Sequence, residues 1–265
     1  MPEGSVFSEY ARYYDLLYKD KKYEAEADYL NGMIHRYRPA AKSILELGAG
    51  TGRHAVLLAD RGYRVHGIER AEEMLARARQ LVADRKRQDP GWCAPMFSAA
   101  DIREVDVHAV FDIVMSVFHV ISYQTSNDDV VAAFRTARKH LNEGGLFIFD
   151  VWYGPAVLTD RPAVRVKRMG DDQIEVTRLA EPVLRPNEDV VEVNYHVFIR
   201  DKKTGQVTET REAHLVRYFF RPELAAFLSQ EHFDLLHSEE WMTGMKPGSS
   251  TWGVCFVARA CAQLR

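Results

Sequence analysis

The sequence has few of the features that mark secreted, metal-binding or membrane proteins. It contains three cysteines (Cys93, Cys255 and Cys261), an odd number without C-x-x-C spacing, which argues against a disulfide framework and a zinc site. Its longest apolar stretch, 111–121, is interrupted by polar side chains and is much shorter than the ~20 residues of a membrane-spanning helix. The sequence therefore predicts reduced cysteines, no metal and no membrane segment.

The chain also lacks an excess of charge of either sign. Its 35 lysines and arginines are opposed by 38 aspartates and glutamates, so the formal net charge is −3 over 265 residues. A charge this small produces no general attraction to nucleic acid or to an anionic membrane surface. The N-terminal residues have neither the basic nor the apolar region of a secretory signal. We therefore expect a cytoplasmic protein with no nucleic-acid or membrane partner.

Strand-like and helix-like segments alternate through the first 160 residues, in a chain whose 46% hydrophobic content is typical of a globular protein. Short apolar runs predict strands at 43–47, 63–68, 94–99, 111–118 and 146–151. Helical patterns occur at 23–37, 53–59, 71–87 and 128–141, and the sequence Asn-Glu-Gly-Gly at 142–145 predicts a break. This alternation is typical of a mostly parallel sheet covered by helices on both faces.

The pattern changes near residue 160. Alternating polar and apolar residues predict four antiparallel strands at 164–169, 174–179, 190–200 and 207–220. A helix is predicted from Pro222 to about His232, followed by strands at 234–237 and 252–258 that can add an antiparallel edge to the sheet. We therefore divide the chain into an α/β core (1–160), an antiparallel insertion (161–220) and a C-terminal part (221–265) that completes the core sheet.

Two segments outside the core are candidates for covering a binding site. Tyr10, Tyr14 and Tyr18 recur at helical spacing, and such an aromatic face either packs in the core or closes over a ligand as a lid. The third insertion strand has an apolar row at alternate positions from Val191 to Ile199, which something must cover. The insertion is therefore expected to pack on the core, to roof the acceptor site or to form the contact of a homodimer.

A glycine-rich turn follows the first predicted strand. Gly48, Gly50 and Gly52 occur in the sequence Glu-Leu-Gly-Ala-Gly-Thr-Gly, and a turn without Cβ atoms lets a charged ligand approach the backbone. The third glycine comes one position too early for the G-x-G-x-x-G fingerprint of NAD-binding proteins. Glu69 ends the second strand, 21 residues after Gly48, where an acid can accept hydrogen bonds from both hydroxyls of a ribose. The pattern indicates an adenosine-containing ligand other than NAD.

The glycine loop and Glu69 together resemble the S-adenosylmethionine site of class I methyltransferases, and the order of elements is similar to their Rossmann-like, seven-stranded sheet. This resemblance implies an α/β fold with the antiparallel sheet inserted, and S-adenosylmethionine as the cofactor. It implies that the backbone of Gly48 and Gly50 lies beside the methionine and ribose groups of the cofactor. It also implies that Glu69 binds the ribose hydroxyls and that Asp101 contacts the adenine amino group. On this basis we expect the following residues to contact the cofactor: Tyr14, Glu46, Gly48, Ala49, Gly50, Glu69, Arg70, Asp101, Ile102 and Ser116.

The segments after the fourth and fifth strands carry the motifs from which the class of methyl acceptor can be predicted. Methyltransferases that act on DNA adenine or on glutamine usually have Asn-Pro-Pro-Tyr/Phe after the fourth strand, and this chain does not. Three features resemble the N,N-dimethyltransferases of nucleotide-linked amino sugars: Tyr-Tyr-Asp-Leu-Leu-Tyr at 13–18, Asp-Val-Trp-Tyr at 150–153 and the inserted strands. Those enzymes have a histidine several residues past the fourth strand. This chain has Tyr123 at that position, and its own histidine, His119, lies four residues before Tyr123.

Open parallel sheets bind ligands beyond the carboxyl ends of their strands, so we expect the acceptor between the segments that follow the fourth and fifth strands. His119 is the first candidate for a general base because imidazoles exchange protons near neutral pH. Tyr123 and Asp150 are the other catalytic candidates. Contacts with the acceptor are expected from Tyr18, Trp152 and Tyr153.

Alternative functions stay open at the level of the sequence. The glycine spacing argues against an NAD-dependent oxidoreductase. A regulator that binds S-adenosylmethionine without turnover has no need of polar side chains at positions such as His119, Tyr123 and Asp150. We therefore expect a methyltransferase with a small-molecule acceptor, either the amine of a nucleotide-linked amino sugar or, in an O-methyltransferase, a hydroxyl of another small metabolite.

Overall fold

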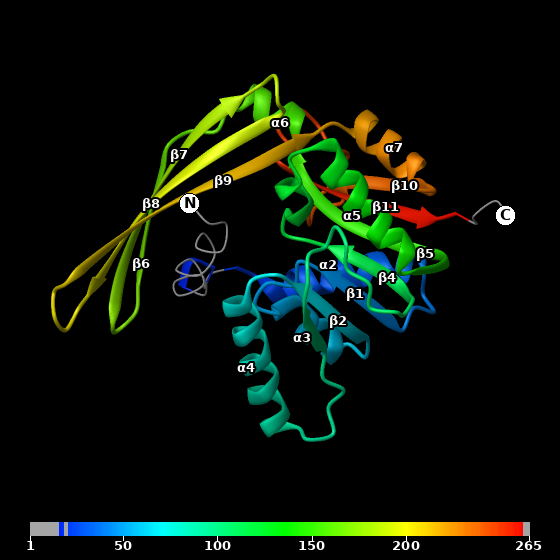
Figure 1. Cartoon of the computed structure of the whole chain (residues 1–265), viewed down its shortest axis with the longest axis horizontal. Coiled ribbons are helices and arrows are strands. Elements are labelled where there is room, and N and C mark those ends of the chain that lie inside the picture. The colour runs from blue at the N-terminus through cyan, green and yellow to red at the C-terminus, as the bar shows by residue number, and fades with distance from the viewer. Residues whose placement is uncertain (1–15, 19–20, 262–265) are drawn as a thin grey trace.

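The computed structural model describes residues 16–18 and 21–261, and its core is one twisted sheet (Figure 1). The seven core strands follow the spatial order β3-β2-β1-β4-β5-β11-β10. Their bounds, in that order, are Met96–Ala99, Arg64–Glu69, Ser43–Leu47, Phe111–Ser116, Leu141–Tyr153, Gly253–Ala260 and Phe233–Glu240. The strands from β3 to β5 are parallel, whereas β11 is antiparallel to both of its neighbours. The predicted seven-stranded α/β fold with an antiparallel edge is confirmed.

Helices cover both faces of this sheet. The helices α5 (Asn127–Lys139) and α7 (Arg221–Gln230) pack on one face, and α2 (Tyr23–Tyr37) and α3 (Arg53–Asp60) pack on the other. Side chains of β5 alternate between the two layers, with Phe147 and Phe149 facing α5 and Ile148 facing α2 and α3. Fully burying a side chain of this size contributes about 1.5 to 3 kcal/mol, so the two layers hold the central strands in place. The remaining long helix, α4 (Glu72–Gln88), contacts α3, β2 and β3.

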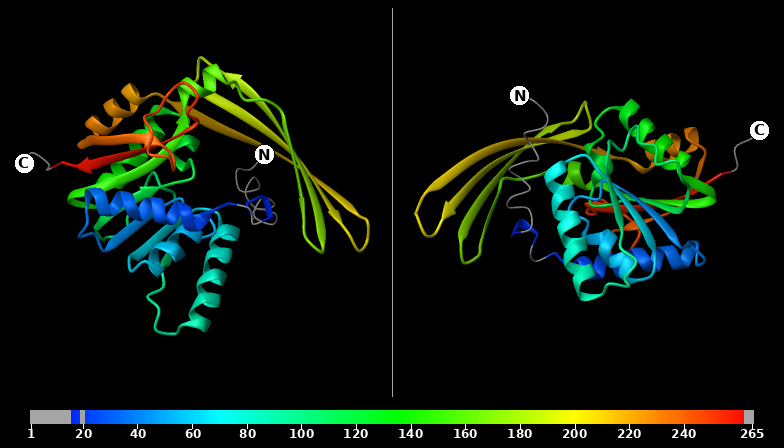
Figure 2. Two further views of the ribbon diagram at one scale, coloured as in Figure 1. Left: turned by 180° about the vertical axis from the view of Figure 1, so that it is seen from behind. Right: turned by 60° about the horizontal axis from the view of Figure 1, so that its bottom comes forward.

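The insertion forms a four-stranded antiparallel arm that extends away from the core (Figures 1 and 2). Its strands are β6 (Arg165–Gly170), β7 (Ile174–Arg185), β8 (Val190–Asp201) and β9 (Val207–Phe219), paired in sequence order. The last strand, β9, returns to the core and pairs in parallel with the end of β5 through Trp152 and Tyr153. Because β11 occupies the other edge of β5, β9 enters on the side of β4. The arm thereby reaches the carboxyl end of β4.

The predicted break at 142–145 is an irregularity inside a strand rather than the gap between two elements. The strand β5 already pairs with β4 at Leu141, which faces Phe111, and pairing resumes at Leu146, which faces Ile113. Residues 142–145 stay in the strand but stand against Asp112 alone, as in a β-bulge, and Gly144 has a φ of +70°. The local prediction was therefore correct about the irregularity but wrong about where β5 begins.

The N-terminal tyrosine row falls mostly outside the described residues, which include Tyr18 but neither Tyr10 nor Tyr14. The ring of Tyr18 lies edge-on to Phe118 at 5.0 Å, and the neighbouring Leu17 is buried against Met74 of α4. The three-part division of the chain and the role of this segment as a lid stay predictions. Among the described helices, none has both the length and the apolar content needed to cross a membrane.

Candidate functional site

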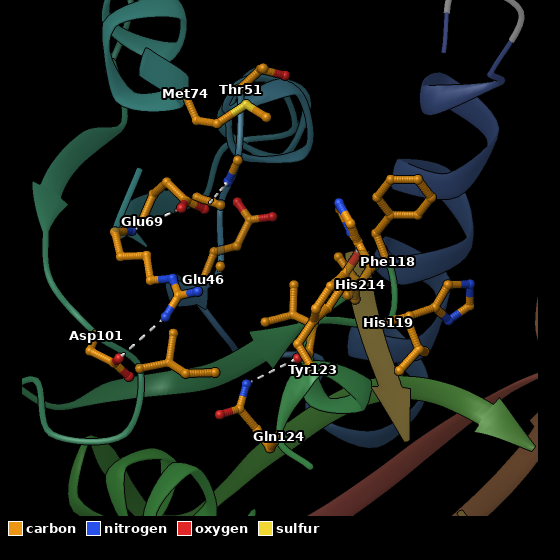
Figure 3. A pocket seen from close by; sticks show the side chains of 18 of the residues that line it. Glu46, Thr51, Glu69, Met74, Asp101, Phe118, His119, Tyr123, Gln124 and His214 are labelled. Carbon is orange, nitrogen blue, oxygen red and sulfur yellow. Dashed lines mark hydrogen bonds and ion pairs between the residues drawn. The ribbon is translucent and has the colours of Figure 1, made fainter. Parts of the chain in front are cut away.

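The carboxyl ends of β1, β2 and β4 open onto a cavity of about 540 Å³, within the usual range for a small-molecule site (Figure 3). In this view Glu69 and Asp101 lie on one side, and Phe118 and His119 lie on the other. Residues 213–216 of β9 and one residue of β8 complete the wall. The cavity therefore lies between the sheet edge, where ligands of open parallel sheets bind, and the base of the arm.

The glycine loop forms one side of the cavity and reverses direction within a few residues. Gly48, Gly50 and Gly52 have φ values of +79°, +55° and +74°, a region that other residues rarely adopt. The N–H groups of Gly48 and Ala49 both donate to the carbonyl of Ile68 at 2.8 Å, which fastens the loop to β2. A Cβ atom on Gly50 would meet no atom within 4 Å, so the backbone there faces open space.

Glu69, at the end of β2, is fixed by backbone groups. One carboxylate oxygen accepts from the N–H of Gly50 at 2.9 Å, and the other accepts from the N–H groups of Arg70 and Ala71 at 2.9 Å. Three charge-assisted hydrogen bonds hold the carboxylate at the mouth of the glycine loop. This is the position in which the sequence predicted a ribose-binding acid.

Glu46 is a buried acid in the cavity wall, with 1% of its surface exposed. Burial, reinforced by the neighbouring charge of Glu69, raises the pKa of Glu46 to about 8. Within the described residues, its Oε2 atom has no hydrogen-bond partner. A buried carboxyl oxygen without a hydrogen bond costs stability, and a ligand with a positive charge or a donor group would satisfy this one.

Behind Glu46 lies a row of ionisable side chains in contact with one another, which the sequence analysis missed. The His54 Nδ1 atom is 3.9 Å from a Glu46 oxygen, and the His54 Nε2 atom is 2.7 Å from Glu26. The Lys21 ammonium lies 3.0 Å from the same Glu26 carboxylate. Burial lowers the pKa of both His54 and Lys21, although Glu26 opposes this effect. No local sequence pattern predicted this row of side chains, because Glu26 and His54 are on different helices.

Asp101 lies on the loop after β3 and is held by arginines. Its carboxylate accepts from the backbone N–H of Arg103 at 2.9 Å and from the Arg103 guanidinium at 2.9 and 2.7 Å. Arg70 lies at 3.9 Å, and Arg103 also reaches Asp129 at 2.8 Å. The hydrogen bonds from Arg103 lower the pKa of Asp101 despite its partial burial. Ile102 beside it lines the cavity and offers an apolar surface to a flat ring.

His119 lies on the side of the cavity opposite Glu69 and Asp101, in contact with Asp150 (Figure 3). The tight turn after β4 gives Phe118 and His119 φ values of +65° and +63°, which turn the imidazole toward the end of β5. The Asp150 carboxylate accepts from the His119 N–H at 3.0 Å and lies 2.7 Å from its Nδ1 atom. Burial works to raise the pKa of Asp150, but the His119 ring and N–H hold it below its usual value. Asp150 is 1% exposed, so it acts on the cavity only through His119.

Tyr123 makes a second polar connection on this side, with residues of β9 that the sequence analysis missed. Its hydroxyl is 3.1 Å from Nδ1 of His214, whose Nε2 atom is 3.2 Å from Glu212. Both Glu212 and His214 are buried. A signal was available: residues 212, 214 and 216 form the inward face of a strand, and two of them are ionisable.

Most of the predicted site residues share this one cavity. The following predicted residues line it: Tyr18, Glu46, Gly48, Ala49, Gly50, Glu69, Arg70, Asp101, Ile102, His119, Tyr123 and Trp152. Tyr14 was also predicted and lies outside the described residues.

Three predicted residues that the structure describes do not line the cavity: Asp150, which lies behind His119, Ser116 and Tyr153. Ser116 is fully buried between β4 and β1, where its hydroxyl donates to the Leu47 carbonyl at 2.9 Å. Tyr153, the last residue of β5, is partly buried and packs against the hydrophobic core. Neighbouring residues of a strand point to opposite faces, so only one of Trp152 and Tyr153 can face the cavity.

Comparison with known proteins shows that this chain is similar to methyltransferases. Residues 44–145 match the model of a methyltransferase domain. The chain is 28% identical over 222 residues to the dTDP-3-amino-3,4,6-trideoxy-alpha-D-glucopyranose N,N-dimethyltransferase of Streptomyces venezuelae, over 82% of this chain and 87% of that protein.

Solved structures agree with this match. An S-adenosylmethionine-dependent methyltransferase from Clostridium acetobutylicum has a TM-score of 0.80 at 20% identity, over 97% of this chain and 99% of that one. An amino pentose methyltransferase from Micromonospora echinaspora, solved with S-adenosylmethionine bound, has a TM-score of 0.72 at 25% identity, over 93% and 95% of the two chains. The chain is a class I S-adenosylmethionine-dependent methyltransferase, similar to amino-sugar N,N-dimethyltransferases.

Proposed function

We propose that the enzyme methylates the amine of a small-molecule acceptor, a nucleotide-linked amino sugar. Three relatives at 24–28% identity are named as N,N-dimethyltransferases of dTDP-linked amino sugars. The observation that carries the proposal is the division of one cavity into an acidic side beside the glycine loop and an aromatic side with His119. This arrangement suits a cationic cofactor next to an amine that must lose a proton.

The acidic side fits the cofactor. In this proposal Glu69 accepts hydrogen bonds from the ribose hydroxyls, and Asp101 accepts one from an adenine amino group that lies above Ile102. Glu46 lines the cavity and its Oε2 atom has no hydrogen-bond partner among the described residues, so in this proposal the positively charged end of the ligand lies beside it. S-adenosylmethionine supplies a methyl group bonded to a positively charged sulfur. These residues bind and orient the cofactor, and the reaction gains its rate from approximation more than from acid or base chemistry.

The aromatic side provides the proton acceptor and excludes water. Asp150 fixes the His119 ring through Nδ1, which leaves Nε2 for the proton of an acceptor ammonium. The rings of Phe118 and Trp152 lie 5.9 and 6.4 Å from the His119 ring. Flat surfaces of this kind can stack on a sugar or a heterocycle and desolvate the amine.

We also propose that the insertion roofs the acceptor side. Tyr195 of β8 and His214 of β9 line the same cavity as the glycine loop, although both belong to the arm. An arm that served only as a dimer contact would have no need to contribute to this wall. A homodimer and a cytoplasmic location stay predictions.

The test is an assay of the purified enzyme with S-adenosylmethionine and three acceptors: a dTDP-linked amino sugar, its hydroxyl analogue and a short peptide amine. Mass spectrometry should show one or two added methyl groups on the amino sugar and none on the other two. Methylation of the hydroxyl analogue alone would replace the proposal with an O-methyltransferase. Cofactor binding without turnover of any acceptor would favour a regulator. The variant Glu69→Ala serves as the control with impaired cofactor binding.

A further inference from the structure

The acceptor side contains a second imidazole in addition to His119. We propose that Tyr123, His214 and Glu212 form a proton relay that the insertion contributes to the acceptor site. The inference rests on the proposed function, because a relay of this kind is needed only if the acceptor nitrogen carries a proton that must leave. It assigns a catalytic purpose to β9, which is otherwise a strand of the arm.

The hydrogen bonds give the relay a direction. A carboxylate can only accept, so Glu212 takes a hydrogen bond from Nε2 of His214 at 3.2 Å, and the Nε2 atom carries the proton. The Nδ1 atom is then the acceptor for the Tyr123 hydroxyl at 3.1 Å. A phenol is protonated near neutral pH, so the Tyr123 hydroxyl carries the proton that it donates.

The surroundings of His214 also favour this arrangement. Glu212 lies on the same strand, Tyr123 on the short helix η2 (Val120–Tyr123) and Tyr195 on β8, with its ring edge-on at 5.0 Å. The Arg178 guanidinium of β7 lies over the ring of Tyr195, 4.7 Å from its centre. Glu212 is the carboxylate bonded to His214, so a proton that arrives at Nδ1 is stabilised by its charge.

The arm contains a second histidine–glutamate pair, and the contrast between the two pairs is informative. His196 of β8 lies 2.6 Å from Glu209 of β9, but the Glu209 side chain is 47% exposed and neither residue lines the cavity. His214 and Glu212 are 4% and 6% exposed, and His214 lines the cavity beside Tyr123. Burying an ionisable pair costs free energy that a surface pair avoids, which a functional role explains.

The proton balance is simple. As the acceptor ammonium gives one proton to the Tyr123 oxygen, the Tyr123 hydroxyl gives its own proton to Nδ1 of His214. The products are a neutral amine and an imidazolium, and the phenol is restored. The amine then has the lone pair that methyl transfer needs. Two transfers to one nitrogen release two protons, so a site with two separate proton acceptors, His119 and this relay, suits a twofold methylation.

The first experiment compares Tyr123→Phe, His214→Gln and Glu212→Gln with the matched controls His196→Gln and Glu209→Gln. At pH 7 and saturating substrates, each relay variant should lower kcat with the amino sugar by about 10²-fold, the lower end of the effect of a lost base, because His119 remains. At pH 9 the relay variants should recover most of that loss, since the free fraction of an ordinary primary amine rises about 100-fold between these pH values. Both controls should keep the parent rate.

Two measurements separate a relay from a structural role. Calorimetry should give the parent affinity for S-adenosylhomocysteine in all five variants, whereas misfolded protein would not bind. A kcat loss of less than about threefold in all three relay variants, or a loss that pH 9 does not restore, would overturn the relay.

The last measurement does not depend on the acceptor, and it distinguishes failure of the relay from failure of the proposed function. ¹⁵N-histidine NMR of the parent should show His214, identified by the signals missing in His214→Gln, as the tautomer protonated at Nε2. The Glu212→Gln variant should lose this preference, and Glu209→Gln should keep it. A parent His214 protonated at Nδ1 would refute the relay even if amino sugars are methylated. The expected tautomer without any amine methylation would refute the proposed function instead.

Discussion

The two sides of the cavity are assembled over very different distances along the chain. The proposed cofactor side comes from residues 46–103, in which each strand is followed by the loop that it positions. The acceptor side combines the turn after β4, the end of β5 and two strands of the arm. Tyr123 and His214, which are hydrogen-bonded, are 91 positions apart. The comparison shows that the cofactor side is a local structure, whereas the acceptor side depends on where the arm enters the core.

The largest effect is expected on the acceptor side, at His119. Its replacement by asparagine removes the imidazole that Asp150 orients, and loss of a general base typically costs about 10²- to 10⁴-fold in rate. Turnover should fall by this amount while the affinity for S-adenosylmethionine, measured by calorimetry, stays within about twofold. An equal fall in affinity would show that the two sides are not separable.

The next largest effect is expected on the cofactor side, at Glu69. The Glu69→Ala variant removes the acceptor of the ribose hydroxyls, and loss of a hydrogen bond to a charged group costs about 1.5 to 3 kcal/mol, or about 10- to 150-fold in affinity. Calorimetry with S-adenosylhomocysteine should report this loss. An unchanged affinity, or tighter binding of NADH by the parent, would contradict the assignment of the site.

Gly48 and Gly50 provide a sharper comparison, because both have positive φ but only one of them touches the acceptor side. A Cβ atom on Gly48 would lie 2.6 Å from the side chain of Val120, at the start of η2, whereas one on Gly50 meets nothing. Both alanine variants should lose about 1 to 2 kcal/mol of unfolding free energy from backbone strain. Gly48→Ala should lose about 1 to 3 kcal/mol more from overpacking, as measured by urea unfolding. Equal losses would show that the loop and η2 move independently.

The smallest effect concerns pH and Glu46. Its pKa is raised from 4.5 to about 8 in the folded protein, so the folded state keeps a proton that the unfolded chain releases. The contribution of Glu46 to stability is therefore fully present below pH 4.5 and is lost as the pH rises toward and through about 8. The Glu46→Gln variant should show a smaller decline in unfolding free energy between pH 5 and pH 9 than the parent. A parallel decline in both proteins would show that Glu46 is ionised throughout.

The sequence was most informative where a ligand contact follows directly from a strand, a turn and a helix. The spacing from Gly48 to Glu69 predicted a carboxylate at the mouth of the glycine loop, and the structure shows one bonded to Gly50. Ser116 marks the limit of this reasoning. It ends β4 at the correct sheet edge, but the face to which it points depends on packing against β1.

By itself, the sequence determined the α/β core, the antiparallel strands and the proximity of Glu69 to the glycine loop, because hydrophobic period and glycine spacing act over a few residues. Only the tertiary structure decided the acceptor side. The pairing of β9 with Trp152 and Tyr153 carries Glu212 and His214 to Tyr123, and the turn after β4 brings His119 onto Asp150. Neither contact leaves a local pattern, because each depends on long-range strand pairing whose register is selected by the burial of side chains from both partners.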